Sequence, residues 1–377
     1  MKRRLAILST HPIQYNAPLF RLLAAEESME LKVFYSKVAE EVRFDRDFGQ
    51  EVVWDIPLTE GYAHSFFRAS HAAGRNCLLE AIVAFAPDAL LVYGWNFPGH
   101  FKAMRHFHGK IPVWFRGDST LLDPLPLWRK GLRKIWLRWV YSHVDIAFYV
   151  GSANKKYFQW AGLSDEQLEY APHAVDNEFF MRDDSRRTNH ARLIRRDLRI
   201  PEEAQVFLYS GKLEPKKQPL QLAEVFSKTF SENSSVHLVY VGSGPMREAL
   251  EQLARSTNNI HVLGFVNQGM MPSYYRLADV VCLPSFGPGE TWGLAINEAI
   301  ASHNCAVFTT DRVGCSNELL RDPYTCVVSA INVSDWPEAL KKLSRHAILP
   351  ENRRNTFVSH YHFEQTVRAL RAHLIAL

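Results

Sequence analysis

Residues 284–299 read PSFGPGETWGLAINEA, and this segment indicates the fold that we expect. An apolar run at 280–283 ends just before Pro284, a glycine-rich loop follows, and a helical pattern begins near Thr291. Strand, loop and helix in this order form the repeating unit of parallel α/β sheets. Because ligands bind beyond the carboxyl ends of the strands in such sheets, the loop at 284–293 is the first candidate for a functional site.

The same alternation of short apolar runs and helical patterns extends along the whole chain and predicts parallel α/β structure. A chain of 377 residues exceeds the size at which one hydrophobic core stops growing, so two Rossmann-like domains are expected. We place them at 1–172 and 173–355, with a last helix at 356–377 that packs back toward the first domain. Strands are predicted at 5–9, 31–35, 52–56, 89–93, 111–115 and 144–150, and then at 206–210, 236–241, 260–263, 280–283 and 306–310. The predicted helices include 76–85, 127–142, 219–230, 245–254 and 291–302, and the arginine-rich stretch 181–199 is interpreted as a solvated linker and helix.

Composition narrows the class of protein. With 47% hydrophobic residues, 22% charged residues and a net charge of +4, the chain is globular and too weakly basic to predict nucleic-acid binding. Its five cysteines form no C-x-x-C pair, which argues against a zinc site, and we expect Cys282 and Cys305 to be buried. The five-residue apolar run near the N-terminus is too short for a signal peptide, and no run reaches the roughly 18 apolar residues of a membrane span. A cytoplasmic protein is therefore predicted.

The loop after the predicted strand at 206–210 carries three lysines. It reads GKLEPKK at 211–217 and places Gly211, Lys212 and Lys217 at the carboxyl end of that strand. Ammonium groups at this position would stabilise the charge of a departing diphosphate. A solvated lysine turn is the alternative interpretation.

Two further loops that follow strands contain glycine. Residues 241–245 read VGSGP, so Gly242 and Gly244 allow a sharp turn or a close approach of the backbone to a ligand. A plain tight turn explains these two glycines more simply. Residues 264–266 read GFV, and their backbone groups could hold a base.

Two glutamates mark the loop and helix at 284–299. Glu290 lies beside the predicted helix N-terminus, where free N–H groups suit a phosphate or sugar oxygens. Glu298 lies among alanines, where a carboxylate is costly unless it binds something, and the paired hydroxyls of a ribose suit it. The alternative is a capping acid at Glu290 and a surface residue at Glu298. The same turn contains Gly289, Thr291, Trp292, Gly293 and Leu294.

In combination these motifs resemble glycosyltransferase family 4. The resemblance covers most of the second half of the chain. It implies a GT-B fold, in which two Rossmann-like domains face a central cleft, with a retaining mechanism and no metal or other cofactor. It rests on GKL-x3-K at 211–217, VGSGP at 241–245, LGF at 263–265, E-x7-E at 290–298 and DRVG at 311–314.

The resemblance also assigns roles within the second half. It implies that Lys212 and Lys217 bind the diphosphate of a nucleotide-sugar donor and that Phe265 meets the base through its backbone. It further implies that Glu290 contacts the donor sugar and Glu298 the ribose. Position 212 is often arginine in the family, and the lysine here keeps the charge without the bidentate fork. We take Glu290, Lys212 and Lys217 as catalytic, and the donor site as Gly211, Gly242, Phe265, Gly289, Thr291, Trp292, Gly293, Leu294 and Glu298.

The first half departs from the family pattern. Many members carry a histidine after the strand at 111–115 that contacts donor sugar and acceptor, whereas this chain has Arg116 and Asp118 there. Either residue could occupy the space of that histidine. Ordinary loop residues are the alternative at every position of the predicted acceptor side, which consists of His11, Gln14, Tyr15, Trp95, His100, Arg116 and Asp118.

The predicted helix at 127–141 reads LWRKGLRKIWLRWVY, with no acidic residue from Pro124 to Val144. Tryptophans and aliphatic residues fall on one face and five basic residues on the other, a pattern of helices that lie in a membrane interface. The alternative is a helix that packs its tryptophans against the sheet and leaves the basic face in water. Either arrangement could attract an anionic membrane surface.

The sequence therefore predicts a metal-independent, retaining glycosyltransferase of surface polysaccharide or glycolipid synthesis. The donor would be a nucleotide sugar, with UDP-sugars preferred over GDP-mannose, and the acceptor a glycan or a lipid-linked molecule. Two other functions remain open, a GT-B sugar-nucleotide epimerase and a non-catalytic protein that binds sugar nucleotides. A dinucleotide-dependent oxidoreductase is disfavoured because no G-x-G-x-x-G follows the first predicted strand. We expect a cytoplasmic protein that contacts the inner face of the cell membrane.

Overall fold

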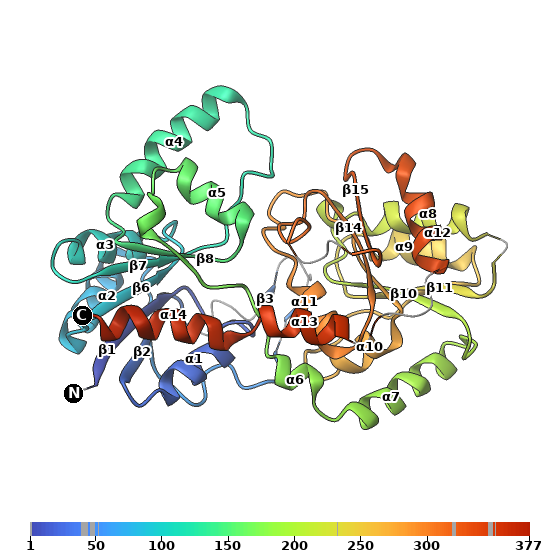
Figure 1. Cartoon of the computed structure of the whole chain (residues 1–377), viewed down its shortest axis with the longest axis horizontal. Coiled ribbons are helices and arrows are strands. Elements are labelled where there is room, and N and C mark those ends of the chain that lie inside the picture. Colours follow the sequence, from blue (N-terminus) through green and yellow to red (C-terminus); the bar gives the residue numbers. More distant parts are fainter. Residues whose placement is uncertain are drawn as a thin grey trace. The chain divides into compact units, whose positions relative to one another are not determined.

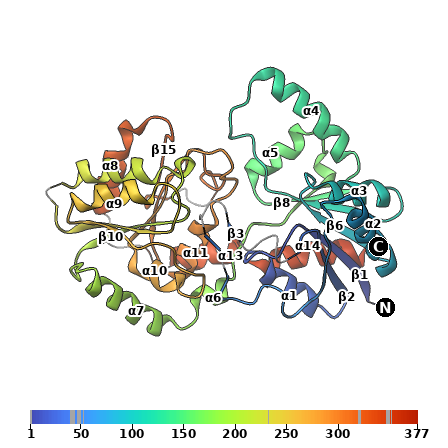
Figure 2. The ribbon, with the colours of Figure 1, turned by 180° about the vertical axis from the view of Figure 1, so that it is seen from behind.

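The computed structural model describes residues 2–38, 44–45, 50–51, 53–231, 233–318, 322–345, 350 and 352–377. These residues form two compact units, each built on its own parallel sheet (Figures 1 and 2). The predicted α/β class with two Rossmann-like domains is confirmed. The first unit comprises Met1–Phe44, Ile56–His173 and His362–Leu377, and the second comprises Asp45–Asp55 and Ala174–Tyr361.

The sheet of the first unit has seven strands in the order β5-β2-β1-β6-β7-β8-β9. From β1 the chain builds outward in one direction through β2 and β5, and in the other through β6 to β9, so the strand order reverses between β1 and β6. Its strands are β1 (Arg3–Ser9), β2 (Met29–Tyr35), β5 (Ala63–Phe66), β6 (Ala89–Tyr93), β7 (Val113–Arg116), β8 (Ile146–Tyr149) and β9 (Leu168–Tyr170). Its helices are α1 (Ala17–Ala25), α2 (Ala72–Phe85), α3 (Pro98–Phe107), α4 (Leu127–Tyr141), α5 (Ser152–Trp160) and α14 (Phe363–Ile375).

The sheet of the second unit has six strands in the order β12-β11-β10-β13-β14-β15, which is the doubly wound order with its reversal between β10 and β13. Its strands are β10 (Gln205–Ser210), β11 (Val236–Val241), β12 (Ile260–Val262), β13 (Val280–Leu283), β14 (Ala306–Thr310) and β15 (Thr325–Val328). Its helices are α6 (Asn177–Met181), α7 (Asp184–Asp197), α8 (Pro219–Thr229), α9 (Arg247–Arg255), α10 (Met271–Leu277), α11 (Leu294–Ser302), α12 (Trp336–Arg345) and α13 (Asn352–His360). Two short strands, β3 (Phe44–Asp45) and β4 (Gln50–Glu51), pair with each other.

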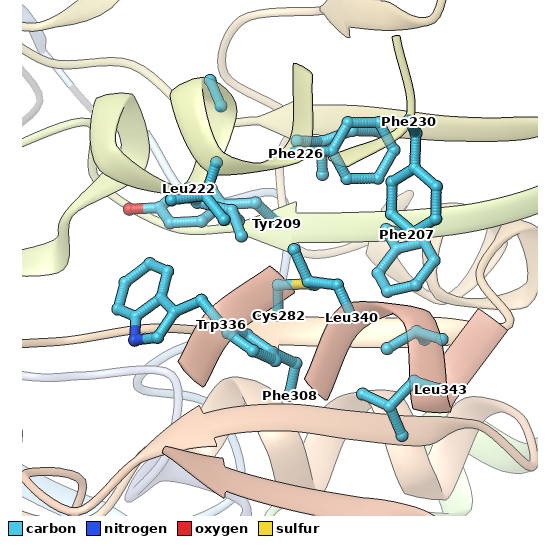
Figure 3. Packing of buried hydrophobic residues seen from close by; sticks show 14 of the residues in the cluster. Phe207, Tyr209, Leu222, Phe226, Phe230, Cys282, Phe308, Trp336, Leu340 and Leu343 are labelled. Atoms are coloured by element: carbon cyan, nitrogen blue, oxygen red, sulfur yellow. The ribbon is translucent and has the colours of Figure 1, made fainter. Parts of the chain in front are cut away.

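Burial of apolar side chains between the second sheet and its helices holds this unit together. Figure 3 shows aromatic rings of β10, α8 and α12 packed around Cys282 of β13. Cys282 and Cys305 are both buried, as predicted. Complete burial of a large apolar side chain contributes about 1.5–3 kcal/mol, so this cluster fixes the strands whose ends carry the candidate site.

The structure corrects the predicted elements at the sheet edges. The strand predicted at 52–56 is wrong for its described residues 53–56, and β5 takes the outer position instead. Neither β9 nor β15 was predicted. All three are edge strands of three or four residues, which is too few to produce a clear sequence pattern.

The units divide the chain differently from the predicted domains. Residues 356–361, expected with the last helix, belong to the second unit, where the Tyr361 ring lies 5.8 Å from that of Trp292. Residues of the range Asp45–Asp55 also cluster with the second unit, although their neighbours in sequence belong to the first. Helix α14 packs against α1, β1 and β9 of the first unit.

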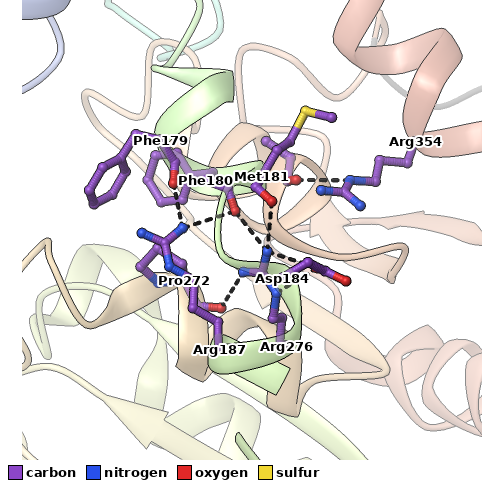
Figure 4. A network of polar contacts seen from close by, with 9 residues as sticks. Phe179, Phe180, Met181, Asp184, Arg187, Pro272, Arg276 and Arg354 are labelled. Carbon is purple, nitrogen blue, oxygen red and sulfur yellow. Dashed lines mark hydrogen bonds and ion pairs between the residues drawn. The ribbon is translucent and has the colours of Figure 1, made fainter. Parts of the chain in front are cut away.

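The arginine-rich stretch at 181–199 contains the predicted helix, α7, whose exposed residues are in water while Arg187, Ala191 and Ile194 are buried and the helix packs against α10. The guanidinium group of Arg276 on α10 is almost completely buried, lies 3.0 Å from the Asp184 carboxylate and donates to the carbonyl oxygens of Phe180 and Pro272 (Figure 4). Arg187 of α7 donates to the Phe180 carbonyl from the other side. Buried charges that are fully hydrogen-bonded lock the start of the second unit to its sheet.

Helix α4 has the predicted bounds, but its tryptophans do not pack into the core. Trp128 is 64% exposed, and only Leu137, Val140 and Tyr141 of this helix are buried. The interpretation of α4 as an ordinary Rossmann helix with its tryptophans against the sheet is therefore wrong.

His100 of α3 lies in the core of the first unit rather than on its acceptor surface. Its imidazole is fully buried, Nδ1 lies 2.8 Å from the Gly94 carbonyl oxygen, and Nε2 lies 2.6 Å from the Ser36 hydroxyl. A carbonyl oxygen only accepts, so Nδ1 carries the proton and Nε2 accepts from Ser36. Burial lowers the pKa of His100 to about 4. The residue thus shapes the turn after β6 and cannot line a binding surface.

We predict that His100 makes the fold sensitive to acid. The imidazole has an unfolded pKa near 6.5, so its contribution to stability is present above that value and is lost as the pH falls toward 4. At pH 4 the loss amounts to about 3 kcal/mol. Thermal unfolding of the wild type and of His100→Asn, measured from pH 7 to pH 4, should show the wild type losing more stability. Parallel pH curves for the two proteins would contradict the assignment.

Candidate active site

The second sheet brings the lysine loop and the Glu290 loop together. β10 and β13 are neighbouring parallel strands at the point where the strand order reverses, so the loops at their carboxyl ends lie side by side. Lys217 Nζ lies 2.5 Å from Glu290 Oε2, and 18% and 14% of the two side chains are exposed. Two residues predicted from separate motifs therefore form one ion pair at the expected ligand edge.

Hydrogen bonds fix the position of this ion pair. The Ser285 hydroxyl donates to Glu290 Oε2 at 2.8 Å, and the Glu290 carbonyl accepts from the Gly314 N–H at 3.0 Å. The Phe286 N–H donates to the Lys216 carbonyl at 2.7 Å and so joins the two loops directly. The pair is thus held by the backbone as well as by its own charges.

The helix within residues 284–299 begins later than predicted. α11 starts at Leu294 rather than Thr291, because Gly293 adopts φ 104° as the residue that precedes it. A Cβ on Gly293 would lie only 2.8 Å from neighbouring side chains, so glycine is required by packing as well as by backbone conformation. The N-cap residue of α11 is Gly293, and the Glu290 carboxylate bonds to Lys217 and Ser285 instead, so the interpretation of Glu290 as a capping acid is wrong.

Trp292 supports the loop from inside. It is 3% exposed, its Nε1 donates to Asn297 Oδ1 at 3.0 Å, and its ring packs near Tyr361. The Trp292 side chain thus has a structural role, and the contact of this residue with the donor stays a prediction. Other predicted donor residues of the turn keep accessible surface: Gly289 is exposed, and Thr291 and Leu294 are half-buried.

Glu298 is buried and held by two side chains. Only 3% of it is exposed, so the surface interpretation is wrong. The Gln268 amide donates to Oε1 at 2.8 Å and the Tyr275 hydroxyl donates to Oε2 at 2.6 Å. Tyr275 is also 3.0 Å from the hydroxyl of Ser210, the last residue of β10. The sequence motifs gave no sign of Gln268 or Tyr275, because their relation to Glu298 arises only from the packing of α10 beside α11.

Three glycines link the loops that follow β10, β11 and β12. The Gly211 N–H donates to the Val241 carbonyl, and the Gly242 N–H donates to the Gly264 carbonyl at 2.7 Å. A Cβ on Gly242 would lie 1.8 Å from the Gly211 carbonyl oxygen. The contact between loops is therefore sufficient to require Gly242, whether or not a ligand also approaches it. Lys212 follows Gly211 in this turn, and its carbonyl accepts from the Tyr209 hydroxyl at 2.7 Å.

The loop that holds Phe265 is contacted by a segment from early in the sequence. The rings of Trp54 and Phe265 lie 6.5 Å apart in an edge arrangement. The Asp55 carboxylate accepts from the Gly269 N–H at 2.9 Å, and the Asn267 side chain bonds to the backbone on both sides of Trp54. Trp54 was not predicted, since nothing in its local pattern indicates that it belongs to the second unit.

On the first unit, Arg116 has a structural role instead of an acceptor role. Its guanidinium group is buried and donates to the carbonyl oxygens of Ala171 and Pro172 at 2.8 and 3.1 Å. These bonds fix the segment that ends in His173. The prediction that Arg116 itself meets an acceptor is corrected by this geometry.

Asp118 and His173 form the polar pair at this edge. Asp118 Oδ2 lies 3.8 Å from His173 Nε2, and 50% and 21% of the two side chains are exposed. Burial lowers the pKa of His173, and the nearby Asp118 opposes this effect. A histidine thus does stand at this edge, supplied by the segment after β9 rather than by the loop after β7. His173 was missed because no motif connects it with Asp118.

The remaining predicted acceptor residues are all half-buried: His11, Gln14, Tyr15 and Trp95. His11 Nδ1 lies 3.0 Å from the Thr10 hydroxyl, and the Trp95 ring lies 6.4 Å from that of Trp136 on α4. In the ranges that the structure describes, no three His, Cys, Asp or Glu side chains are grouped so as to hold a metal ion.

The sequence of the second unit is similar to that of known glycosyltransferases. Residues 191–357 match the family described as "Glycosyl transferases group 1". A D-inositol 3-phosphate glycosyltransferase of Geodermatophilus obscurus is 31% identical over 190 residues, which cover 47% of this chain and 41% of that protein. A phosphatidyl-myo-inositol mannosyltransferase of Mycolicibacterium smegmatis is 32% identical over 108 residues, 28% of each chain. The chain thus spans less than half the length of these curated relatives.

Similarity in structure extends over both units. The sucrose-phosphate synthase of Thermosynechococcus elongatus superposes with a TM-score of 0.72 at 15% identity and covers 100% of both chains. At this level of identity the likeness shows the fold alone. The fold is GT-B, as predicted.

We predict that Lys217 and Glu290 are energetically coupled in the unliganded protein. A double-mutant cycle with Lys217→Ala and Glu290→Ala should give a coupling free energy of about 1–2 kcal/mol, because the pair is mostly shielded from water. Urea unfolding of the four proteins measures it. The exposed Lys228 on α8 serves as a control, since Lys228→Ala should show no coupling to Glu290→Ala. Additive effects of the Lys217 and Glu290 substitutions would contradict the prediction.

Proposed function

We propose that this chain, whose residues 191–357 belong to the glycosyl transferases group 1 family, is a retaining glycosyltransferase that uses a nucleotide-sugar donor. The observation that carries the proposal is the Lys217–Glu290 ion pair at the strand-order reversal of the second sheet. Ligands of doubly wound sheets bind at this position, and the pair offers one group for a diphosphate and one for a sugar.

The transfer breaks the bond between the sugar and the diphosphate, and negative charge develops on the departing diphosphate. Lys217, together with Lys212, would stabilise that charge. Lys217 would exchange its bond to Glu290 for one to the diphosphate, which frees the Glu290 carboxylate to accept hydrogen bonds from hydroxyls of the donor sugar. Because lysines supply the positive charge, we propose that the reaction needs no metal.

Glu298 would bind the ribose. The Gln268 amide and the Tyr275 hydroxyl each donate to one oxygen of this carboxylate, and a carboxylate oxygen can accept more than one hydrogen bond. The two protein donors would hold the carboxylate in place before the nucleotide arrives. Phe265 would meet the base through its backbone, and we place UDP-sugars ahead of GDP-mannose as donors.

On the acceptor side, we propose a glycan or a lipid-linked molecule, with Asp118 and His173 as its polar contacts. A relative is named for transfer to phosphatidyl-myo-inositol, which supports a lipid-linked acceptor. The proposed place of action is the cytoplasm, with peripheral contact between Leu127–Tyr141 and an anionic membrane surface. The proposed product would enter surface polysaccharide or glycolipid synthesis.

Nucleotide binding gives the first test. In a thermal-shift panel of UDP, GDP, ADP and their sugars, UDP should raise the melting temperature most, since a ligand at 100 times its Kd stabilises by about 2.7 kcal/mol. Glu298→Ala should abolish most of that shift, and Tyr275→Phe should reduce it, whereas Glu338→Ala on the exposed side of α12 should leave it unchanged. Equal shifts in the Glu298 and Glu338 variants would refute the ribose role.

Turnover gives the second test. Glu290→Ala should lower kcat far more than it lowers UDP affinity, because its proposed partner is the transferred sugar. Lys217→Ala should lower kcat/KM by a factor that corresponds to about 2–4 kcal/mol, since a preorganised cation acts on the transition state. Sugar release is followed with and without candidate acceptors, and Lys228→Ala is the control. Turnover that needs no acceptor and yields an isomeric sugar nucleotide would indicate an epimerase instead.

A further inference from the structure

Helix α4 exposes an unusually large share of its apolar side chains. All of residues 127–136 are exposed, and the helix is buried only where Leu137, Val140 and Tyr141 reach the core of the first unit. Figures 1 and 2 show α4 on the outside of this unit, with its first turns extending away from the sheet. Among these residues, Arg133 donates to the Tyr157 hydroxyl and the Trp136 ring lies near the rings of Trp95 and Phe101, while residues 127–132 present an exposed surface.

The exposed apolar residues form one face. On a helix of about 3.6 residues per turn, Trp128, Leu132, Ile135 and Trp139 fall opposite the buried side. Ile135 is 71% exposed, Trp128 64% and Leu132 62%. Isolated exposed apolar residues are normal, but a contiguous group of this kind marks an interaction site.

Neighbouring residues extend and anchor this face. Leu121 and Leu125 of the preceding loop and Leu127 at the start of the helix are also exposed. At the other end, the rings of Trp136 and Trp139 lie 6.4 and 4.9 Å from that of Phe101 on α3. The apolar surface is thus attached to the unit at one end and free at the other.

Positive charge borders the apolar face on both sides. Arg129 and Arg138 fall along the two borders of this face, whereas Lys130, Arg133 and Lys134 fall farther round the helix, and Arg133 donates to the Tyr157 hydroxyl. The Arg129 guanidinium group lies 5.0 Å from the centre of the Trp128 ring. No acidic residue occurs from Pro124 to Val144, so nothing on the helix neutralises these cations.

We propose that the exposed face of α4 inserts into the interface of an anionic lipid membrane. Tryptophan, leucine and isoleucine side chains would enter the boundary between headgroups and acyl chains, while the flanking arginines and lysines would contact lipid phosphates. The helix would lie in the plane of the membrane. No helix in the described ranges is long and apolar enough to cross a membrane.

Charge separates this partner from a second copy of the chain. A symmetric dimer through the apolar face of α4 would place the same surface of each copy against the other, and it would bring the cations that border this face close to those of the partner. Such like-charge contact is unfavourable, whereas an anionic membrane offers both opposite charge and apolar depth. Membrane contact through α4 extends the proposed function, and only its link to a lipid-linked acceptor rests on that function. Vesicle binding tests the contact without a measurement of turnover.

The experiment is flotation of the full chain with vesicles of phosphatidylcholine alone or mixed with phosphatidylglycerol. The wild type should bind the anionic vesicles and not the neutral ones. Neutralising four charges with Arg129→Gln, Lys130→Gln, Lys134→Gln and Arg138→Gln should weaken binding on the order of 100-fold at low salt. Replacing the apolar face with Trp128→Ser, Leu132→Ser and Ile135→Ser should weaken it at least about tenfold, including in 0.5 M salt, where electrostatic attraction is screened.

A matched control uses exposed apolar residues of the second unit. Leu193→Ser with Ile331→Ser should bind vesicles like the wild type, since Leu193 and Ile331 are also exposed but lie outside α4. Thermal unfolding and UDP-induced shifts confirm that each variant is folded. Wild-type binding by the triple serine variant would overturn the proposal. A second outcome would also overturn it. If the wild type is a dimer that does not bind vesicles, and the triple serine substitution converts it to a monomer, then a second copy of the chain covers this face.

Discussion

The ion pair between Lys217 and Glu290 is the contact on which the candidate site depends. Less than a fifth of each side chain is exposed to water at this end of the sheet, so either charge alone would be costly to bury. Each residue therefore requires the other until a ligand binds. The pair forms because β10 and β13 are adjacent and parallel, which in turn follows from the core around Cys282. The fold therefore preorganises a cation and an anion that a donor, with its diphosphate and sugar, can separate.

Sequence patterns predicted those features that are local in the chain. Long apolar runs identified the inner strands of both sheets, because strands covered on both faces must be apolar throughout. Loop residues such as Lys217 and Glu290 could be chosen because parallel strands present their carboxyl ends on one side of the sheet. Edge strands such as β9 and β15 were missed, since their short and partly exposed sequences resemble loops.

Residues whose partners come from distant elements could not be assigned from sequence. A loop histidine or arginine can turn inward as readily as outward, and His100 and Arg116 both turn inward to bond backbone carbonyls. Conversely, Tyr275 and His173 acquire their significance from Glu298 and Asp118, which lie far away in the chain. Only the tertiary structure, which brings α10 beside α11 and the segment after β9 beside the loop after β7, reveals such pairs.

The exposed charges of α4 destabilise this helix in water, and contact with an anionic membrane would remove that effect. In water, like charges four residues apart destabilise a helix by about 0.2–0.5 kcal/mol per pair, and Arg129–Arg133, Lys130–Lys134 and Lys134–Arg138 are three such pairs. Packing onto the unit offsets this cost mainly at residues 137–141, because the preceding turns stay largely exposed. An anionic interface would screen the repulsion and cover the tryptophans at the same time. The same residues that weaken the helix in water would thus stabilise it where a lipid-linked acceptor resides.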